Sequence, residues 1–233
     1  MTTLDPAVAA HRPVLPTLPA HVTLPGPFRG VCFDLDGLLV ETEEIWKEGK
    51  RLLFARHGVP FDHADHLAVF GTSEAQTAAH FAARFGLPPD AAPEVGLEYR
   101  ALVARLFEAP IACRPGALEL VASLQGRVPI AVATNTRRSM AEVILRQSGL
   151  IDRFDAVATG DEVPPKPAPD VYLAACRALG VAPADAVGLE DSPTGVAAVK
   201  AAGMTCVAVP SDAASDVSAA DLVIGSLAEL IPA

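Results

Sequence analysis

The sequence is short of positive charge, of cysteine and of long apolar runs, and each shortage excludes a class of protein. Lysine and arginine number 18 against 28 aspartates and glutamates, which argues against nucleic-acid binding because phosphate backbones are held by clustered basic side chains. The four cysteines form no close pair, so neither a disulfide framework nor a zinc site is predicted. No apolar run reaches the roughly 18 to 20 residues that a membrane span needs. We expect a cytoplasmic monomer that binds neither nucleic acid nor membrane.

Hydrophobic residues, in contrast, are plentiful. They make up 51% of the 233 residues, against 20% charged, which is enough for a folded core and excludes disorder over most of the chain. Residues 1–27 are the exception, since they hold six of the 21 prolines and show no hydrophobic periodicity. They also lack the basic and apolar regions of a secretory signal. We predict a proline-rich arm over 1–27 that takes no part in the chemistry.

The remaining sequence shows two different hydrophobic patterns. Short apolar runs typical of buried strands occur at 30–33, 128–133, 155–159, 185–189 and 204–209, and they alternate with helical patterns at 116–125, 138–148, 169–180 and 193–202. This alternation predicts a doubly wound, parallel-sheet α/β core over 28–42 and 111–233. Residues 43–110 have helical spacing throughout, with breaks at 57–60, 71–73 and 86–89. We predict that 43–110 is an inserted α-helical domain, called the cap below.

Polar side chains lie directly after three of the predicted strands, and in the loop after a fourth. They are Asp34 and Asp36, Thr134 and Asn135, Lys166, and Glu190 and Asp191. Each has an ordinary explanation alone, such as a turn, a helix cap or a solvated lysine. Together they should meet at one edge of the sheet, because ligands bind at the carboxyl ends of parallel strands.

The residue types at this edge indicate phosphoryl chemistry. Converging carboxylates repel one another unless a cation lies among them, and a site rich in carboxylate oxygens suits Mg²⁺. A magnesium ion beside a lysine and a hydroxyl would neutralise a phosphoryl group during its transfer. A carboxylate can itself attack phosphorus and form an aspartyl-phosphate that water later hydrolyses. A second carboxyl two residues further along an extended backbone can protonate the leaving oxygen.

Four runs in this order and spacing resemble the motifs of the haloacid dehalogenase superfamily. They are 33–40 (FDLDGLLV), 133–135 (ATN), 166–170 (KPAPD) and 188–195 (GLEDSPTG). The likeness covers about residues 28 to 226. Within the superfamily the chain is similar to the branch with a helical cap inserted after the first motif, which includes sugar-phosphate phosphatases and β-phosphoglucomutase. The resemblance implies a Rossmann-like core and a small phosphorylated metabolite as the binding partner.

The resemblance also implies a role for each motif residue. Asp34 would be the nucleophile and a magnesium ligand, and Asp36 the general acid/base, with its backbone carbonyl on the metal. Thr134 would hydrogen-bond the phosphoryl group and Lys166 would neutralise it. The remaining three implied assignments are Asp191 as a metal ligand, Glu190 on or near the metal, and Asn135 orienting the phosphate or substrate.

Three alternative functions have different requirements. A dehalogenase needs neither a second aspartate nor magnesium, so Asp36 and the carboxylates at 190–191 argue against it. A binding protein without activity should have a broken motif, and none is broken. A phosphosugar mutase of the β-phosphoglucomutase type needs basic cap groups to hold a second phosphate. At the corresponding positions the chain has Trp46 and Glu74, so we favour a magnesium-dependent phosphatase and keep the mutase as the alternative.

The cap should set the substrate. Trp46, Thr72 and Ser73 suit a neutral, hydroxyl-rich leaving group, with the indole packing against a sugar or polyol. Nearby basic residues at 47, 50 and 51 leave open that one of them points inward. The histidines at 63 and 66, with aspartates at 62 and 65, could bind a second metal, but we favour a solvated helix start there.

Overall fold

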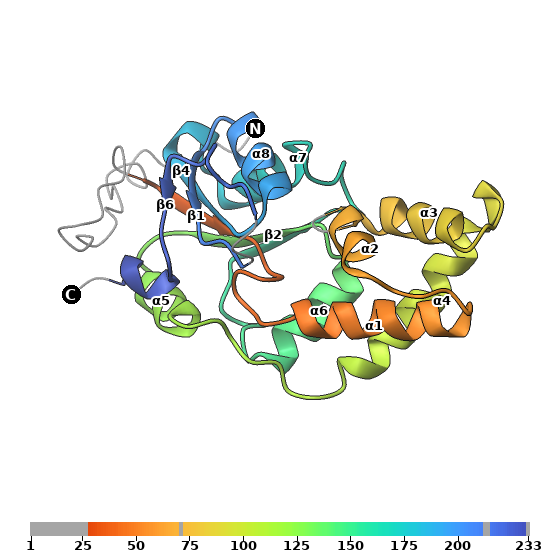
Figure 1. The fold of residues 1–233 in the computed structure, drawn as a ribbon. Coiled ribbons are helices and arrows are strands. Elements are labelled where there is room, and N and C mark those ends of the chain that lie inside the picture. The colour runs from red at the N-terminus through yellow and green to blue at the C-terminus, as the bar shows by residue number, and fades with distance from the viewer. Residues whose placement is uncertain (1–27, 70–71, 212–214, 232–233) are drawn as a thin grey trace, which may run out of the picture.

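The computed structural model describes residues 28–69, 72–211 and 215–231, so the predicted arm over 1–27 lies outside the described residues. One sheet of six parallel strands forms the centre, in the order β3-β2-β1-β4-β5-β6. The strands are β1 (Gly30–Phe33), β2 (Ile130–Thr134), β3 (Ala156–Thr159), β4 (Ala186–Glu190), β5 (Thr205–Ala208) and β6 (Leu222–Val223). The predicted α/β class is therefore confirmed (Figure 1).

Both faces of the sheet are buried, and they carry side chains of different sizes. Large side chains such as Phe33 and Ile130 point to the face that packs with α5 (Ala117–Leu124) and α6 (Arg138–Gln147). Small ones such as Cys32 point to the opposite face, where α7 (Asp170–Leu179) and α8 (Pro193–Ala201) pack closely. Buried strands of this kind lack polar alternation, which is why the sequence shows them as continuous apolar runs.

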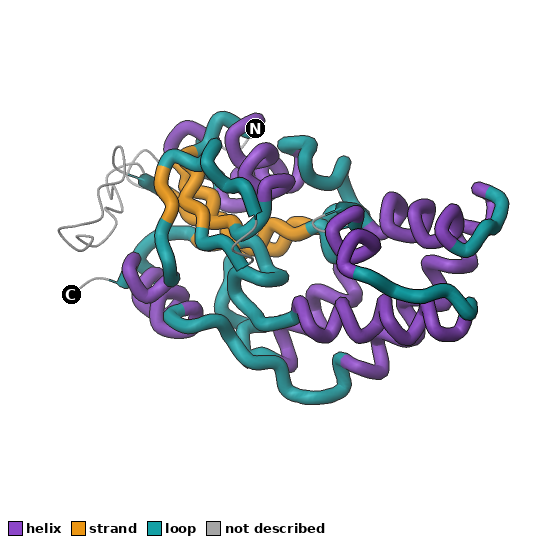
Figure 2. The backbone as a smooth tube through the Cα atoms, in the orientation of Figure 1, coloured by secondary structure: helices purple, strands orange, loops and turns teal. Residues whose placement is uncertain are grey.

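The helical insertion between β1 and β2 forms a separate layer beside the sheet (Figures 1 and 2). It contains α1 (Glu43–Arg56), α2 (His63–Ala68), α3 (Glu74–Arg84) and α4 (Ala92–Leu106), with a 3₁₀ turn at Pro89–Ala91. Phe54 and Phe81 are fully buried in edge-to-face contact at 5.3 Å, with Phe85 beside them. These aromatic rings form the core of the cap.

Two crossings join the cap to the core, and they pair with each other. Val40 and Cys113 form an antiparallel bridge. On either side of it the Glu41 amide donates to the Ala112 carbonyl at 2.9 Å, and the Arg114 amide donates to the Leu39 carbonyl at 2.9 Å. The chain therefore leaves and re-enters the core at one place.

Further 3₁₀ turns lie at Pro183–Asp185 and Leu227–Leu230. No described helix is long and apolar enough to cross a membrane.

Candidate active site

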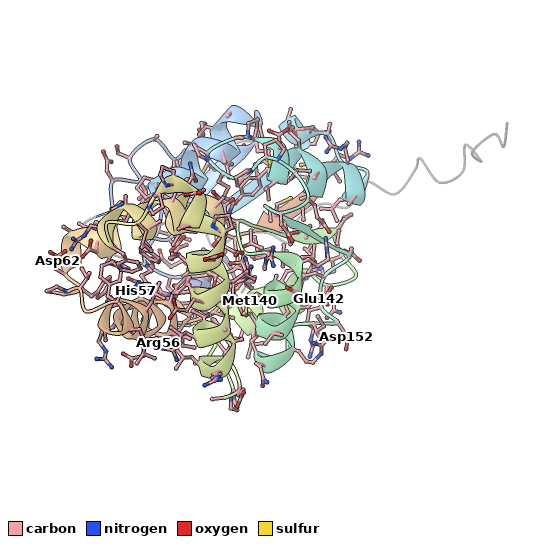
Figure 3. All side chains as sticks on the ribbon, turned by 90° about the vertical axis from the view of Figure 1, so that its right-hand side faces the viewer. Arg56, His57, Asp62, Met140, Glu142 and Asp152 are labelled. Carbon is pink, nitrogen blue, oxygen red and sulfur yellow. The ribbon has the colours of Figure 1, made fainter. Side chains whose placement is uncertain are left out.

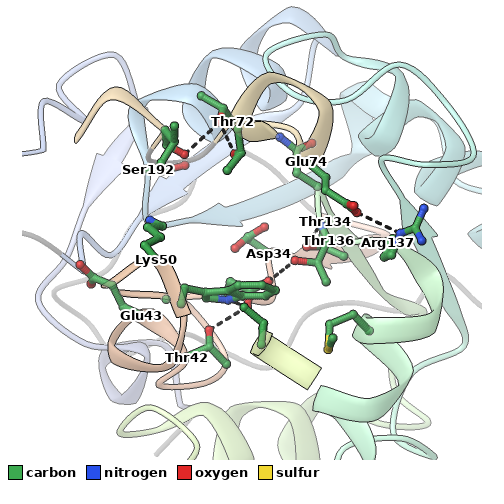
Figure 4. Close-up of a pocket in the computed structure, with 18 of the residues that line it drawn as sticks. Asp34, Thr42, Glu43, Lys50, Thr72, Glu74, Thr134, Thr136, Arg137 and Ser192 are labelled. Atoms are coloured by element: carbon green, nitrogen blue, oxygen red, sulfur yellow. Dashed lines mark hydrogen bonds and ion pairs between the residues drawn. The ribbon is translucent and has the colours of Figure 1, made fainter. Parts of the chain in front are cut away.

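A cavity of about 180 Å³ lies where the cap meets the carboxyl ends of the central strands. From the core it is lined by Asp34, Asp36, Thr134, Asn135, Lys166 and Asp191, and from the cap by Trp46, Lys50, Thr72, Glu74 and Arg100. Figure 4 shows Asp34 near the centre, with Lys50 and Glu43 across the cavity from Glu74 and Arg137. Figure 3 shows Met140 of α6, another lining residue, between α6 and α4.

Asp34 follows β1 and carries a buried carboxylate at the floor of the cavity. Its amide donates to the Leu189 carbonyl at 3.0 Å, which extends the β1–β4 pairing to this position. Lys166 donates directly to Asp34 Oδ1. Burial raises the pKa of Asp34 well above its ordinary value; the ammonium of Lys166 opposes that rise, and the carboxylates of Glu190 and Asp191 add to it. An ionised Asp34 therefore depends on positive charge close by.

Lys166 is held between acidic and aromatic groups. Its Nζ donates to Glu190 Oε1 at 2.6 Å as well as to Asp34, and it lies 5.0 Å from the centre of the Tyr172 ring. Burial alone would lower the pKa of Lys166, but the two carboxylates outweigh it and raise that pKa above its ordinary value. Lys166 therefore stays protonated across the physiological range.

Glu190 is fully buried, and protein donors already occupy both of its oxygens. Oε1 accepts from Lys166 and from the Tyr172 hydroxyl at 2.7 Å. Oε2 accepts from the Asp191 amide at 3.0 Å and the Ser192 hydroxyl at 3.3 Å. Glu190 does not line the cavity, unlike the other core residues predicted for the site. These contacts orient Lys166 and the loop that carries Asp191.

The carboxylates form a set that could hold a metal ion. Single oxygens of Asp34, Glu190 and Asp191 all lie within 4.8 Å of one another. Burial, and then the charge of Glu190, raises the pKa of Asp191 to about 7, although Ser211 donates to its Oδ2 at 2.6 Å. When all three carboxylates are ionised, the single charge of Lys166 leaves two negative charges, and a hard divalent cation with oxygen ligands fits that imbalance. The Asp36 side chain is not part of this set.

Asp36 instead points to a cage of three donors. Oδ1 accepts from the Thr42 hydroxyl and from Trp46 Nε1, both at 2.7 Å, and Oδ2 accepts from the Thr136 hydroxyl at 2.6 Å. Thr136 belongs to the core and Trp46 to the cap, so this carboxylate links the two. Thr42 and Thr136 are not among the residues predicted for the site, although Thr136 lies two residues after Thr134, the spacing that places side chains on one face of an extended backbone.

Trp46, predicted to pack against a sugar or polyol, lines the cavity and is held there by several contacts. Its indole N–H is bonded to Asp36, and its ring packs against Phe107 at 5.1 Å and Tyr99 at 6.3 Å. Ser73, also predicted to contact substrate, does not line the cavity and instead caps α3, where it bonds with Gln76. Thr72 does line the cavity, and its hydroxyl lies 3.0 Å from that of Thr77.

Thr134 is the last residue of β2, and Asn135 follows it beside the Lys166 loop. The Thr134 hydroxyl accepts from the Thr136 amide at 3.0 Å. Asn135 Oδ1 accepts from the Lys166 amide at 2.7 Å, and Asn135 Nδ2 donates to the Lys166 carbonyl at 3.2 Å. In this structure Asn135 therefore fixes the backbone of Lys166.

On one wall of the cavity, three polar side chains of the cap contact one another in sequence: Lys50, His66 and Glu43. They answer which of the basic residues at 47, 50 and 51 points inward. Lys50 points inward and is only 6% exposed. Its Nζ lies 3.2 Å from His66 Nδ1, and His66 Nε2 lies 3.3 Å from Glu43 Oε1. Burial, with a contribution from Lys47, lowers the pKa of Lys50 to about 8, and Glu43 opposes that shift. The expected solvated helix start is wrong for Asp65 and His66, which are buried because the start of α2 packs onto α1 and α3.

The opposite wall carries two arginines and one glutamate. Glu74 Oε1 accepts from Arg100, and Glu74 Oε2 lies 3.0 Å from Arg137 Nε. All three residues line the cavity. The cavity therefore has charged groups on both walls, because α1 and α4 turn the basic side chains of Lys50 and Arg100 toward it.

Comparison with known proteins adds the family. A model described as a haloacid dehalogenase-like hydrolase matches residues 28–203. The chain is 35% identical over 207 residues to validoxylamine A 7'-phosphate phosphatase of Streptomyces hygroscopicus subsp. limoneus, covering 87% of this chain and 96% of the relative. It is 32% identical over 186 residues to the fructose-1-phosphate phosphatase YqaB of Escherichia coli (strain K12), covering 78% and 96%.

Solved structures agree with these relatives. CbbY from Rhodobacter sphaeroides in complex with phosphate is 32% identical with a TM-score of 0.78, and the match covers 87% of this chain and 96% of CbbY. A mutant of the same protein was solved with xylulose-(1,5)bisphosphate. The family model spans most of the chain, and these relatives share more than 30% identity over nearly their full length. The chain therefore belongs to the haloacid dehalogenase-like hydrolases.

Proposed function

We propose that the protein is a magnesium-dependent phosphatase that hydrolyses small phosphomonoesters, above all sugar or polyol phosphates, through an aspartyl-phosphate. The observation that carries this proposal is the buried Asp34 carboxylate, which faces the cavity in contact with the Lys166 ammonium. A carboxylate and a cation side by side on a cavity floor supply a nucleophile and a counter-charge for a phosphoryl group. Relatives named as phosphatases of phosphorylated sugars and related compounds support the same chemistry.

The proposed reaction has two displacements at phosphorus. In the first, an Asp34 oxygen bonds to phosphorus while the bond from phosphorus to the leaving oxygen breaks, and Asp36 gives that oxygen a proton. In the second, Asp36 takes a proton from water as the water oxygen attacks the same phosphorus. The bond to Asp34 then breaks, which releases inorganic phosphate and restores the carboxylate.

The surrounding residues stabilise the charge that develops. Lys166 and the Thr134 hydroxyl are the donors for the phosphoryl oxygens, and Glu190 and Asn135 keep Lys166 in place. Asp34 and Asp191 would hold Mg²⁺ at the cavity, with Glu190 beside them and Asp36 contributing its backbone carbonyl. When bound, the ion neutralises the carboxylates and the phosphoryl group together.

A phosphosugar mutase remains the second candidate because Arg100 and Arg137 line the cavity. A mutase must keep a doubly phosphorylated intermediate, and arginine is the strong ligand for a second phosphate. The structure of a CbbY mutant with xylulose-(1,5)bisphosphate makes a substrate with two phosphates a real alternative. The ion pairs of both arginines with Glu74 favour the phosphatase.

The test is phosphate release from a panel of sugar, polyol and nucleotide monophosphates and phosphoglycolate. We expect release from sugar or polyol monophosphates that is lost on exhaustive chelation and restored by Mg²⁺. Asp34→Asn should abolish turnover, because an amide cannot form the acyl-phosphate. Full activity after chelation, or in Asp34→Asn, would contradict the mechanism. Rapid interconversion of β-glucose 1-phosphate and glucose 6-phosphate would favour the mutase.

A further inference from the structure

The wall formed by Glu74, Arg100 and Arg137 assembles residues from three elements around one carboxylate. Glu74 begins α3, Arg100 lies on α4, and Arg137 directly precedes α6 of the core. Each Glu74 oxygen faces a different guanidinium. Figure 4 shows the Glu74–Arg137 pair at the side of the cavity away from Lys50, with Asp34 between them.

The ordinary explanation of such a cluster is that its ion pairs stabilise the folded protein by joining cap and core. The solvent exposure of its side chains limits that contribution. The side chains of Glu74 and Arg100 are 28% and 29% exposed, and that of Arg137 is 38% exposed. Ion pairs with this much solvent contact contribute little to stability. Their effect on a ligand is different, because a substrate filling the cavity displaces the water that screens them.

We infer that Glu74 is a specificity residue that keeps Arg100 and Arg137 from binding a second phosphate and so restricts the enzyme to leaving groups without one. This inference rests on the proposed function. A phosphate group carries about -1.5 to -2 charge at neutral pH. Glu74 already faces Arg100 Nη1 and Arg137 Nε, so a phosphate that approaches either guanidinium also approaches the Glu74 carboxylate, and like charges in contact discriminate strongly against the wrong partner.

The same wall suits a polyol. A hydroxyl group both donates and accepts hydrogen bonds, while a guanidinium only donates and a carboxylate only accepts. The paired Glu74 and Arg137 therefore offer complementary partners to neighbouring hydroxyls without losing their mutual charge balance. An anionic leaving group could use the arginines alone and would leave Glu74 facing it.

The test compares Glu74→Gln with Glu98→Gln. Glu98 is a matched control because it is 32% exposed on the same cap and is paired with Arg56 and His57, but it does not line the cavity. The probes are fructose 1-phosphate and fructose 1,6-bisphosphate, compared by kcat/KM. We expect Glu74→Gln to raise the bisphosphate-to-monophosphate ratio by about 10- to 100-fold, through KM, as the removal of a like-charge contact implies. Glu98→Gln should leave the ratio unchanged.

A binding measurement keeps the inference testable if turnover is slow. Calorimetric titration with fructose 1,6-bisphosphate should give a Kd that falls about 10- to 100-fold in Glu74→Gln and returns toward the wild-type value in Glu74→Gln/Arg137→Met. Glu74→Asp, which keeps the charge, is a second variant if Glu74→Gln does not fold, and it should still reject the bisphosphate. An unchanged ratio and Kd in Glu74→Gln would overturn the role of Glu74, whereas a wild-type protein that hydrolyses no monophosphate would overturn the proposed function instead.

Discussion

Replacing Lys166 by methionine tests whether one buried cation holds the site together. Methionine is similar in length but carries no charge, so the substitution removes both of the ammonium contacts, to Asp34 and to Glu190, with little change in volume. Lys166 is only 3% exposed, and water cannot take its place freely. When its carboxylates are all ionised, the cluster of Asp34, Glu190 and Asp191 changes from two net negative charges to three.

The expected cost follows from that charge. Removing one partner of a buried ion pair costs about 3–5 kcal/mol of unfolding free energy, because the other charge is left buried and uncompensated. The loss should depend on pH. A carboxylate whose pKa is raised by folding destabilises the folded state above that pKa, and the penalty disappears below the unfolded value, about 4. With the pKa of Asp191 already near 7, the loss in Lys166→Met should be largest above pH 7 and smaller at pH 5.

The assay is urea unfolding in the presence of a chelator at pH 5 and pH 8, with Lys200→Met as the control. Lys200 donates to Asp221 at 2.6 Å but is 39% exposed, so its removal should cost about 0–1 kcal/mol. Added Mg²⁺ should stabilise Lys166→Met more than the wild type, because the ion replaces the missing positive charge. Equal losses in the two variants at pH 8 would refute the reasoning.

Three further outcomes are expected. Asp36→Asn should lower kcat for alkyl phosphates by about 10²–10⁴-fold and less for p-nitrophenyl phosphate, whose leaving group needs no proton; equal losses would contradict an acid role. Because the pKa of Lys50 is about 8, its charge is present below that pH and lost above it. The KM for sugar phosphates should therefore rise above pH 8, and a Lys50→Met enzyme that keeps this rise would exclude Lys50 as its cause. Gly195→Ala should lower the melting temperature and kcat together, since the added methyl overlaps the Glu190 carboxylate, whereas Gly96→Ala, with only Ala78 nearby at 3.2 Å, should have a small effect on both.

The core of the fold and the floor of the site could be predicted because both depend on local pattern. Buried parallel strands appear as apolar runs, and residues that follow them necessarily gather at one sheet edge, so Asp34, Thr134 and Asp191 come together. The two-residue strand β6 could not be found in this way, because Leu222–Val223 is too short to show a period.

The cap wall could not be predicted for a different reason. Which face of α1 meets the cavity depends on how the helix packs, and the sequence offered basic residues at 47, 50 and 51 without a means to choose Lys50. The partners of Asp36 are equally hidden, since Thr136 lies 100 residues away in the sequence. Ser73 is a different case, because a residue typical of a binding loop is also typical of a helix N-cap, which is where the structure places it.

The paired crossings at Val40 and Cys113 have a consequence for how this enzyme could diverge. Since the insertion begins and ends on adjacent backbone, its length and sequence place no geometric demand on β1 and β2, which pair directly through Val31 and Ile130. The cap can therefore be exchanged, in evolution or by grafting, while Asp34 keeps its place after β1. A replacement cap must also supply a donor for Asp36 in place of Trp46 Nε1.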